Sequence, residues 1–371
     1  MDKQKAGLAL NHAMEITEKN WKMFEGGFPA PASMNNLYPK IVNNDWTAGF
    51  YTGMLWLFYE YSHRPFFREL AEKQLPDFRD RLERRVVVDH HDMGFIFGLS
   101  CVAAYKLTGN ASARETALIA ADNLKSRFHE KGQFIQAWGL LGDPNEYRLI
   151  IDCLLNLPLL YWASEVTGDP SYRICAEKHF DTARKTVIRE DFSTYHTYYF
   201  DKETGMPSYG ATKQGYSDSS TWSRGQAWGV YGLILNYAWQ KDSTILPEWK
   251  GVTDYFIDHL PEDLTAYWDF HFRDGDEPRD SSASAIAVCG IQEAYRQGGC
   301  DKAYLDKAYE ILDSLVDNYA AKPEEKGNGL LKHATYGRLL GEGVDEFSLW
   351  GDYFYVEALY RVIQPDWKMY W

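Results

Sequence analysis

The chain has 371 residues, of which 45% are hydrophobic and 25% are charged, and its formal net charge is −14. This size and balance are typical of a globular protein with a large core and exclude an intrinsically disordered chain. The acidic balance argues against nucleic acids and anionic membrane surfaces as partners, because both bind through basic patches. The 16% aromatic content fits either a core of large side chains or a sugar-binding surface.

The N-terminal stretch 1–21 has apolar residues at helical spacing and no apolar run like that of a signal peptide. No run reaches the ~18–20 apolar residues that a membrane span needs. The 5 cysteines include no CxxC pair, which favours free thiols in a reducing compartment and argues against structural zinc. We therefore expect a cytoplasmic protein that is a monomer or a weak homo-oligomer.

Helical patterns of two kinds alternate along the chain. Amphipathic segments are expected at 5–22, 65–85, 111–129, 170–187, 245–259 and 301–320. Strongly apolar segments are expected at 46–61, 92–107, 149–166, 222–239, 281–297 and 351–363. A helix that is apolar all round is buried, whereas a helix with a polar face lies at the surface.

The connections SHRP (62–65), TGN (108–110), TGDP (167–170) and GGCD (298–301) each close one helical pattern and open the next. Six buried helices ringed by six surface helices predict an all-α fold, an (α/α)6 barrel that occupies residues 1–371 as one domain. A linear solenoid of helix pairs is the alternative. Solenoids usually have regular repeat lengths, and here the apolar helices start at irregular intervals.

The long connections all precede apolar helices, which gathers them on one face and predicts a cleft there. Two of them, STYHTYYFD (193–201) and TAYWDFHF (265–272), alternate as strands do. We therefore expect short β ribbons at the mouth of the barrel and no substantial sheet.

Polar residues gather where these connections enter the apolar helices. They are Asp45, Trp46, Asp89, His90, His91, Asp92, Arg148, Asp152, Asp218, Arg224, Gln226, Trp228, Arg279, Asp280, Ser281, Trp350 and Asp352. Taken alone, each polar side chain here could cap a helix, and capping is the expected role of Asp280 and Asp352. Six converging helix N-termini also create a positive potential that suits an anion.

Among these residues, His90, His91 and Asp92 raise the question of a metal. Adjacent side chains rarely bind one ion together, and no HExxH-type spacing supplies further ligands, so no metal is expected. No nucleotide-binding or nucleophile-elbow motif occurs in a credible context, so no cofactor is expected either.

Asp92 and Asp152 both open very apolar segments. Two carboxylates at one mouth are the arrangement that glycoside hydrolysis uses, and apolar surroundings raise a carboxyl pKa into the range useful for acid catalysis. Two independent helix caps are the structural alternative.

Seven motifs give the chain a family resemblance. In chain order they are NNDWTAGFYTGMLWL, DHHDMGF, QAWG, IIDCLLNLPLLYWA, SSTWSRGQAWGVYG, RDSSASAIA and WGDYFYVEAL. Together they span residues 43 to 359, and the sequence resembles the unsaturated glucuronyl hydrolases. The related unsaturated rhamnogalacturonyl hydrolases, which act on pectin fragments, match less closely and remain an alternative.

The resemblance implies an (α/α)6 hydrolase without a metal. It implies action on lyase-generated oligosaccharides that end in a 4,5-unsaturated uronic acid, glycosaminoglycan disaccharides above all. Its reaction hydrates the C4=C5 double bond, so the carboxylate-separation rule for retention and inversion does not apply.

The resemblance also assigns residues. It implies that Asp152 is the general acid/base and Asp92 the second essential carboxylate. It implies substrate contacts from Trp46, His91, Trp138, His196, Gln214, Arg224 and Trp228. Arg224 is the expected partner of the uronate carboxylate, because a guanidinium fork suits that group. Each tryptophan could instead be ordinary core.

The sequence departs most from the family at 326–345 and at the C-terminal QPDWKMYW. Lys332, His333, Arg338 and Lys368 in these segments could contact a sulfate or simply be solvated. Two other functions stay open. A sugar epimerase on the same fold would need a histidine pair such as His91 and His196, and a non-catalytic sugar-binding protein would not need an Asp152 set among apolar residues.

Overall fold

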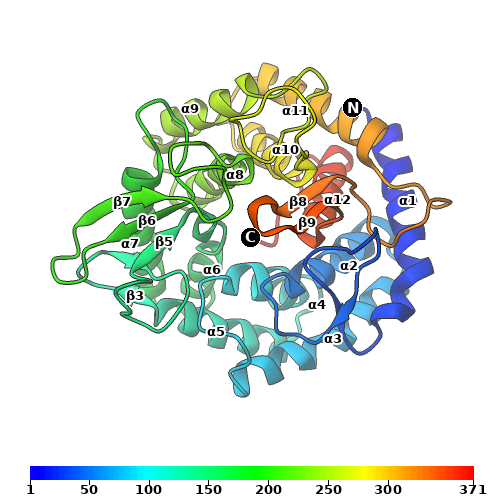
Figure 1. The fold of residues 1–371 in the computed structure, drawn as a ribbon. Helices are drawn as coiled ribbons and strands as arrows, with labels where there is room; N and C mark the ends of the chain where they lie inside the picture. The colour runs from blue at the N-terminus through cyan, green and yellow to red at the C-terminus, as the bar shows by residue number, and fades with distance from the viewer.

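The computed structural model describes residues 1–371 and arranges twelve α-helices in two concentric rings (Figure 1). The outer ring consists of α1 (Lys3–Asn20), α3 (Pro65–Glu83), α5 (Ala111–Lys125), α7 (Pro170–Val187), α9 (Ile245–Asp258) and α11 (Lys302–Ser314). The inner ring consists of α2 (Ala48–Ser62), α4 (Ala103–Thr108), α6 (Pro158–Thr167), α8 (Ser223–Gln240), α10 (Ser281–Arg296) and α12 (Leu349–Ile363). The expected (α/α)6 barrel is confirmed.

Hydrophobic patterning explains which helices lie inside. In α8 every residue from Ser223 to Asn236 is buried, and in α10 every residue from Ser281 to Ala294. The outer helix α9 instead buries Ile245, Trp249, Val252, Thr253 and Phe256, which recur at the three- and four-residue spacing of one helix face. None of the helices combines the length and apolarity needed to cross a membrane.

Two inner helices begin irregularly, so the predicted continuous helices at 92–107 and 149–166 were wrong in detail. The first starts with a π-helical segment, η2 (Gly94–Val102), before α4. The second is divided into a 3₁₀ segment, η3 (Ile151–Leu155), and α6, because Pro158 lacks an N–H and is suited to the first turn of a new helix. Shorter irregular helices are η1 (Trp21–Phe24), η4 (Leu315–Tyr319) and η5 (Arg338–Leu340).

The strands are short, as expected. They are β1 (Phe28–Pro29), β2 (Lys40–Ile41), β3 (Phe128–His129), β4 (Phe134–Ile135), β5 (Arg148–Ile150), β6 (Thr197–Phe200), β7 (Pro207–Ala211), β8 (Ala334–Gly337) and β9 (Glu342–Glu346). The largest sheet is antiparallel β5–β6–β7, in which Tyr199 of β6 lies opposite Arg148 and Tyr209. It projects from one side of the ring, whereas the β8–β9 hairpin lies over its centre (Figure 1).

The strand expected at 193–201 is confirmed in part as β6, but the strand expected at 265–272 was wrong. That segment makes only isolated bridges, from Tyr267 to Arg279 and from Asp269 to Trp222. The carboxylate of Asp269 accepts the backbone N–H of His271 at 2.9 Å, and this local turn ends the extended pairing.

Asp280 and Asp352 do not cap their helices, contrary to expectation. Asp280 precedes α10 but accepts from the Ser282 hydroxyl and from Arg224 instead of a helix N–H. Asp352 lies inside α12 and accepts the backbone N–H groups of Leu330 and Leu331 at 3.0 and 2.8 Å. Burial raises the pKa of Asp352 to about 7. Both residues are buried, and each accepts from at least one donor that is distant in the sequence, as a buried carboxyl group needs hydrogen-bond partners.

The C-terminal segment turns back into the barrel. The ring of Trp371 stacks on Phe354 with 6.0 Å between centroids, and its indole N–H donates to Glu357 at 3.1 Å. Trp371 also packs against Phe95, which in turn contacts Trp46 and Trp228. The ammonium of Lys106 donates to the carbonyls of Met369 and Tyr370 and holds the segment in place.

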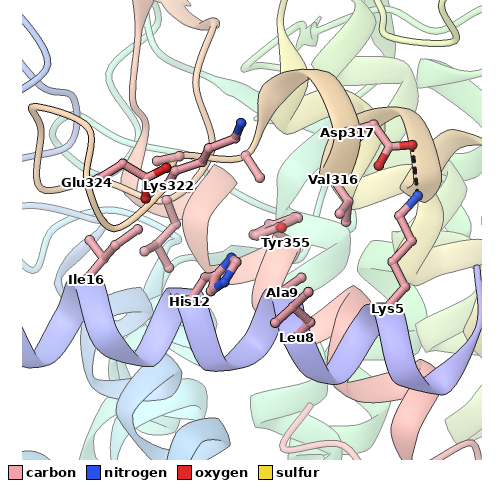
Figure 2. Close-up of a pocket in the computed structure, with 14 residues that line it drawn as sticks. Lys5, Leu8, Ala9, His12, Ile16, Val316, Asp317, Lys322, Glu324 and Tyr355 are labelled. Atoms are coloured by element: carbon pink, nitrogen blue, oxygen red, sulfur yellow. Dashed lines mark hydrogen bonds and ion pairs between the residues drawn. The ribbon is translucent and has the colours of Figure 1, made fainter.

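A cavity of about 320 Å³ lies on the outer side, between α1 and the residues around η4 (Figure 2). Alanine and larger aliphatic side chains line most of it, and the ion pair of Lys5 with Asp317, 2.8 Å long, borders it. None of the predicted site residues lines this cavity.

Close packing of the inner helices makes Gly49 irreplaceable. A Cβ there would overlap the carbonyl oxygen of Phe95 and lie 2.6 Å from the Cα of Ile96. We predict that Gly49→Ala lowers the free energy of unfolding by at least about 2 kcal/mol, as overpacking does. Gly98→Ala is the control, because a Cβ at Gly98 meets no atom within 4 Å. That control should be neutral or slightly stabilising. Equal urea midpoints for the two variants would contradict the packing.

Candidate active site

A second cavity, of about 280 Å³, opens where the long connections meet the inner helices. It brings together all nine predicted site residues: Trp46, His91, Asp92, Trp138, Asp152, His196, Gln214, Arg224 and Trp228. These side chains come from seven segments that are distant in the sequence. The barrel therefore assembles one site from them, as the converging loops predicted.

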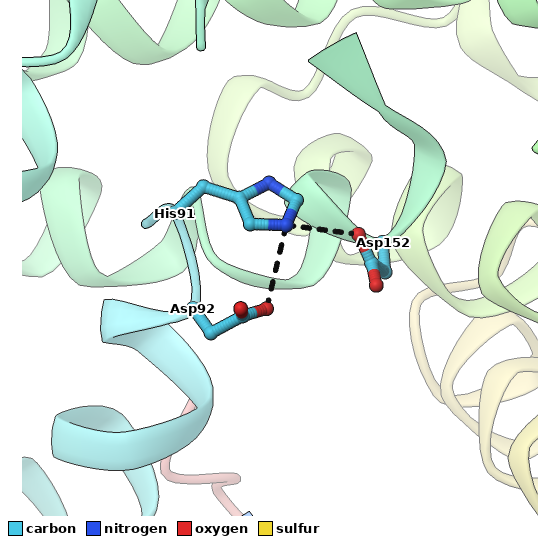
Figure 3. A group of neighbouring side chains, drawn as sticks. All are labelled: His91, Asp92 and Asp152. Atoms are coloured by element: carbon cyan, nitrogen blue, oxygen red, sulfur yellow. Dashed lines mark ion pairs between the residues drawn. The ribbon is translucent and has the colours of Figure 1, made fainter. Parts of the chain in front are cut away.

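The two aspartates lie on either side of one imidazole (Figure 3). The Nε2 atom of His91 is 3.4 Å from Oδ1 of Asp92 and 3.3 Å from Oδ1 of Asp152. His91 and Asp92 directly precede η2, and Asp152 lies in η3. The backbone N–H of His91 donates to the carbonyl of Ala137 at 2.7 Å, which fixes the imidazole-bearing loop.

His91 is neutral at neutral pH. Its side chain is 1% exposed, and this burial lowers the pKa of His91 to about 4, in spite of the nearby charge of Asp92. A neutral imidazole carries one N–H, so it can donate to only one carboxyl oxygen at a time. The ring can therefore hydrogen-bond to the pair without adding a charge to the site.

Asp92 is ionised. Burial opposes its charge, but a hydrogen bond from His90 and the positive charge of Arg81 favour the ionised form, and the pKa of Asp92 is lowered from its ordinary value. The Nδ1 atom of His90 lies 2.9 Å from Oδ2 of Asp92. Arg81 is buried itself and donates to the carbonyl of Asp45, which places a fixed positive charge behind the site.

The surroundings of Asp152 favour its protonated form. Burial raises the pKa of Asp152 well above its ordinary value, and the negative charge of Asp92 raises it further. The charge of Arg224 and the backbone N–H groups of Asp152 and Cys153 oppose this rise without cancelling it. The Oδ1 atom of Asp152 is buried and has no hydrogen-bond partner. The environment thus separates the two carboxyl groups into an acid and a base, the division of roles found in many acid–base enzymes.

His196 and Gln214 form the opposite wall. The Nδ1 atom of His196 accepts the backbone N–H groups of Lys213 and Gln214 at 3.0 and 3.3 Å, which leaves Nε2 as the donor. Burial lowers the pKa of His196 well below its ordinary value, so the ring is neutral. Its face lies 4.3 Å from the ring of Trp222.

Arg224 lines the cavity but is already engaged. It forms a buried ion pair with Asp280 and donates to the carbonyls of Thr335 and Tyr336, both at 2.7 Å. It also donates to Oε1 of Gln214 at 3.1 Å. Both terminal nitrogens therefore have protein partners. The structure gives Arg224 a role that the sequence did not suggest, which is to anchor the β8–β9 hairpin and Gln214 at the cavity.

The three predicted tryptophans differ in setting. Trp46 stacks on Trp350 at 5.2 Å and donates to the hydroxyl of Tyr336 at 3.0 Å. Trp138 lies against the guanidinium of Arg148 at 4.4 Å. Trp228 is only 1% exposed and contributes part of its ring to the cavity floor.

Sequence reasoning did not single out five of the lining residues, which are Asn44, Val87, Lys213, Trp222 and Tyr336. All except Tyr336 lie within four residues of a predicted site residue. The possible sulfate contacts Lys332, His333, Arg338 and Lys368 are absent from the cavity lining. Lys332, His333 and Arg338 instead pair with Glu325, Asp345 and Glu277 respectively.

His91, Asp92 and Asp152 are also the group whose ligand atoms all lie within 4.8 Å of one another, as in a metal site. The imidazole lies between the two carboxyl groups, with its Nε2 atom 3.4 and 3.3 Å from their oxygens, so packing around one ring nitrogen brings the three side chains close. The grouping therefore does not by itself indicate a metal ligand set.

Comparisons with known proteins give a consistent result. The family model described as Glycosyl Hydrolase Family 88 matches residues 29–365. The unsaturated chondroitin disaccharide hydrolase of Streptococcus pneumoniae is 48% identical, with 100% of this chain and 95% of the relative covered.

Solved structures agree with the sequence comparison. The unsaturated glucuronyl hydrolase of Streptococcus agalactiae superposes with a TM-score of 0.97 at 45% identity, over 100% of this chain and 94% of that chain. A mutant of the Streptococcus agalactiae enzyme complexed with dGlcA-GalNAc6S superposes with a TM-score of 0.89 at 41% identity, over the same shares of both chains.

The buried ion pair at the cavity generates a stability prediction. Removing the carboxylate in Asp280→Ala leaves the buried charge of Arg224 without its partner and should cost about 3–5 kcal/mol of unfolding free energy. The control is Asp306→Ala, which removes the exposed ion pair with Lys302 at 2.7 Å and should cost less than about 1 kcal/mol. Urea unfolding measures both, and similar losses would argue against a buried pair.

Proposed function

Because the chain belongs to Glycosyl Hydrolase Family 88 and is a glycoside hydrolase, we propose that it removes the 4,5-unsaturated uronic acid from lyase-generated glycosaminoglycan disaccharides. Chondroitin disaccharides are the first choice of substrate. The name of the Streptococcus pneumoniae relative and the dGlcA-GalNAc6S bound to the Streptococcus agalactiae mutant support that choice.

The observation that carries the proposal is the pair of unlike carboxyl groups. Protonated Asp152 and ionised Asp92 lie on either side of a neutral imidazole in a cavity with aromatic walls. A carboxylic acid that must protonate a carbon–carbon double bond near neutral pH needs a raised pKa. The burial of Asp152 provides it.

In the proposed reaction the Asp152 carboxyl gives its proton to C4, and the electron pair of the C4=C5 bond forms the new C–H bond. Positive charge develops at C5, shared with the ring oxygen, and a water oxygen adds there. The Asp152 carboxylate takes back a proton from that water. The resulting hemiketal opens to a 5-keto group, and the hemiacetal left at C1 releases the neighbouring sugar, so the overall change is addition of one water.

The remaining residues hold the sugar. Asp92 accepts hydrogen bonds from its hydroxyl groups, while Trp46, Trp138 and Trp228 offer apolar faces for stacking. His196 and Gln214 lie near the reacting ring. The uronate carboxylate is attracted by Arg224 and by Lys213, whose ammonium has no protein partner and which lines the same cavity. Lys213 supplies the freer charge because Arg224 is already paired.

We also propose that residues 1–371 act as one catalytic domain in the cytoplasm, as a monomer or a weak homo-oligomer. One hydrophobic cluster of 101 buried residues extends from Ala6 to Trp371, which supports one domain. All five cysteines are unpaired, and four of them are buried, which supports a reducing compartment.

Turnover can be followed by ultraviolet absorbance, because hydration destroys the double bond conjugated to the carboxylate. The protein should erase the absorbance of an unsaturated chondroitin disaccharide and release N-acetylgalactosamine as a monosaccharide. Unchanged absorbance with chondroitin, hyaluronan, heparin and pectin products alike would refute the proposal. A faster rate on pectin fragments would favour a rhamnogalacturonyl hydrolase, and an intact but isomerised disaccharide would favour an epimerase.

Asp152→Asn should abolish this activity, since the amide cannot deliver the proton. We predict a fall in kcat of about 10²–10⁴-fold or more, the usual contribution of a general acid, with an unchanged circular dichroism spectrum. Asp352→Asn is the control, because Asp352 is a buried aspartate of the same barrel that lies outside the cavity. It should keep most of the activity. An active Asp152→Asn enzyme would remove Asp152 from the mechanism.

A further inference from the structure

Asn156 connects the two segments that carry the carboxyl groups. It is fully buried and follows Asp152 by four residues, at the end of η3. Its Oδ1 accepts the backbone N–H of Phe95 at 2.8 Å, and its Nδ2 donates to the carbonyl of Asp152 at 3.3 Å. Phe95 follows Asp92 by three residues, so one amide group bonds to both segments.

The chemistry of this bridge fits asparagine closely. The Phe95 N–H can only donate and the Asp152 carbonyl can only accept, so the bridging side chain needs one acceptor and one donor. Phe95 lies in the first turn of η2, where backbone N–H groups have no partner within the helix. Asn156 therefore caps η2 from a neighbouring element.

Gly94 makes the bridge possible. A Cβ at Gly94 would lie 2.5 Å from the Cα of Asn156 and 2.9 Å from its Oδ1. The two backbones thus approach each other as closely as a glycine permits. Because this contact lies within four residues of both aspartates, it limits how far apart their segments can move.

The Asp152 carboxyl depends on its backbone for its position. Its Oδ1 atom is buried without a hydrogen-bond partner, and His91 lies 3.3 Å away. A carboxyl group with so few direct bonds is positioned mainly by the segment that carries it. That segment is bonded to the Asp92 segment through Asn156.

We propose that Asn156 is a positioning residue for the reaction, which sets the separation of the Asp92 and Asp152 carboxyl groups through its contact with Gly94. This inference rests on the proposed function and deepens it. Asn156 does not line the cavity, but it would control the distance between the Asp92 and Asp152 carboxyl groups, on which the acidity of Asp152 depends.

The test compares the same substitution at two buried asparagines, Asn156→Ser and Asn236→Ser. Asn236 is also fully buried and donates to the carbonyl of Leu154 at 3.0 Å, but it makes no hydrogen bond to the Asp92 segment. Both variants lose buried hydrogen bonds and should lose stability in urea. Only Asn156→Ser should lower kcat, by about 10–100-fold, with KM changed by less than about twofold, because the carboxyl group is misplaced and substrate binding is kept.

The pH profile gives a second readout. The charged and titratable groups around the Asp152 carboxyl are Asp92, His91, Arg224, Cys153 and, across the cavity, His196 and Lys213. Asp92 is the nearest negative charge, so a wider separation should let Asp152 lose its proton at lower pH. The alkaline limb of kcat should therefore move to lower pH in Asn156→Ser and stay in place in Asn236→Ser.

Gly94→Ala changes the same contact from the other side, with Asn156 intact, and should show the same pattern as Asn156→Ser. If Asn156→Ser keeps the wild-type kcat and pH limb, or matches Asn236→Ser in both, the inference is overturned. Wild-type turnover of the unsaturated disaccharide is measured first. Its absence would overturn the proposed function, whereas wild-type turnover with unaffected Asn156→Ser kinetics overturns only the positioning role.

Discussion

The structure depends on removing two carboxyl groups from water beside one uncharged imidazole. Such burial costs several kcal/mol for each charge that has no partner. The two carboxyl groups differ in how many partners offset this cost. Asp92 receives His90 and the field of Arg81, whereas Asp152 receives almost nothing and keeps its proton. The pKa values of these two aspartates therefore move in opposite directions because their surroundings differ. The apolar inner helices provide the burial that raises the pKa of Asp152.

In the barrel, the inner helices form the core, and the loops that precede them carry most of the polar cavity residues. The inner helices α8 and α10 are buried along nearly their whole length, and their packing fixes the positions at which the loops begin. Long-range polar bonds then hold the loops themselves. Arg224 reaches the β8–β9 hairpin and Asp280, so one guanidinium ties together three segments that meet only in the folded chain. A side chain used in this way is part of the scaffold and of the cavity wall at once.

Much of this architecture could be predicted from the sequence, because hydrophobic patterning is a local property. The alternation of apolar and amphipathic helices indicated two rings, and Asp92 and Asp152 stood out because they open very apolar segments. The π-helical start of η2 had no local signal, since it depends on contacts of Gly94 and Phe95 with Asn156. Tyr336 and the partners of Arg224 were missed for the same reason, as Arg224 and Thr335 are 111 residues apart. The segment 265–272 has the alternation of a strand, but the turn at Asp269, where its carboxylate accepts the His271 N–H, prevents a regular strand.

The C-terminal Trp371 is connected to the cavity by a chain of aromatic contacts. Its ring packs against Phe95, and Phe95 contacts Trp46 and Trp228, which line the cavity. Trp371 does not itself line the cavity. A change at this last residue can therefore reach two aromatic walls of the cavity through one intermediate residue, Phe95, without any direct contact with what the cavity holds.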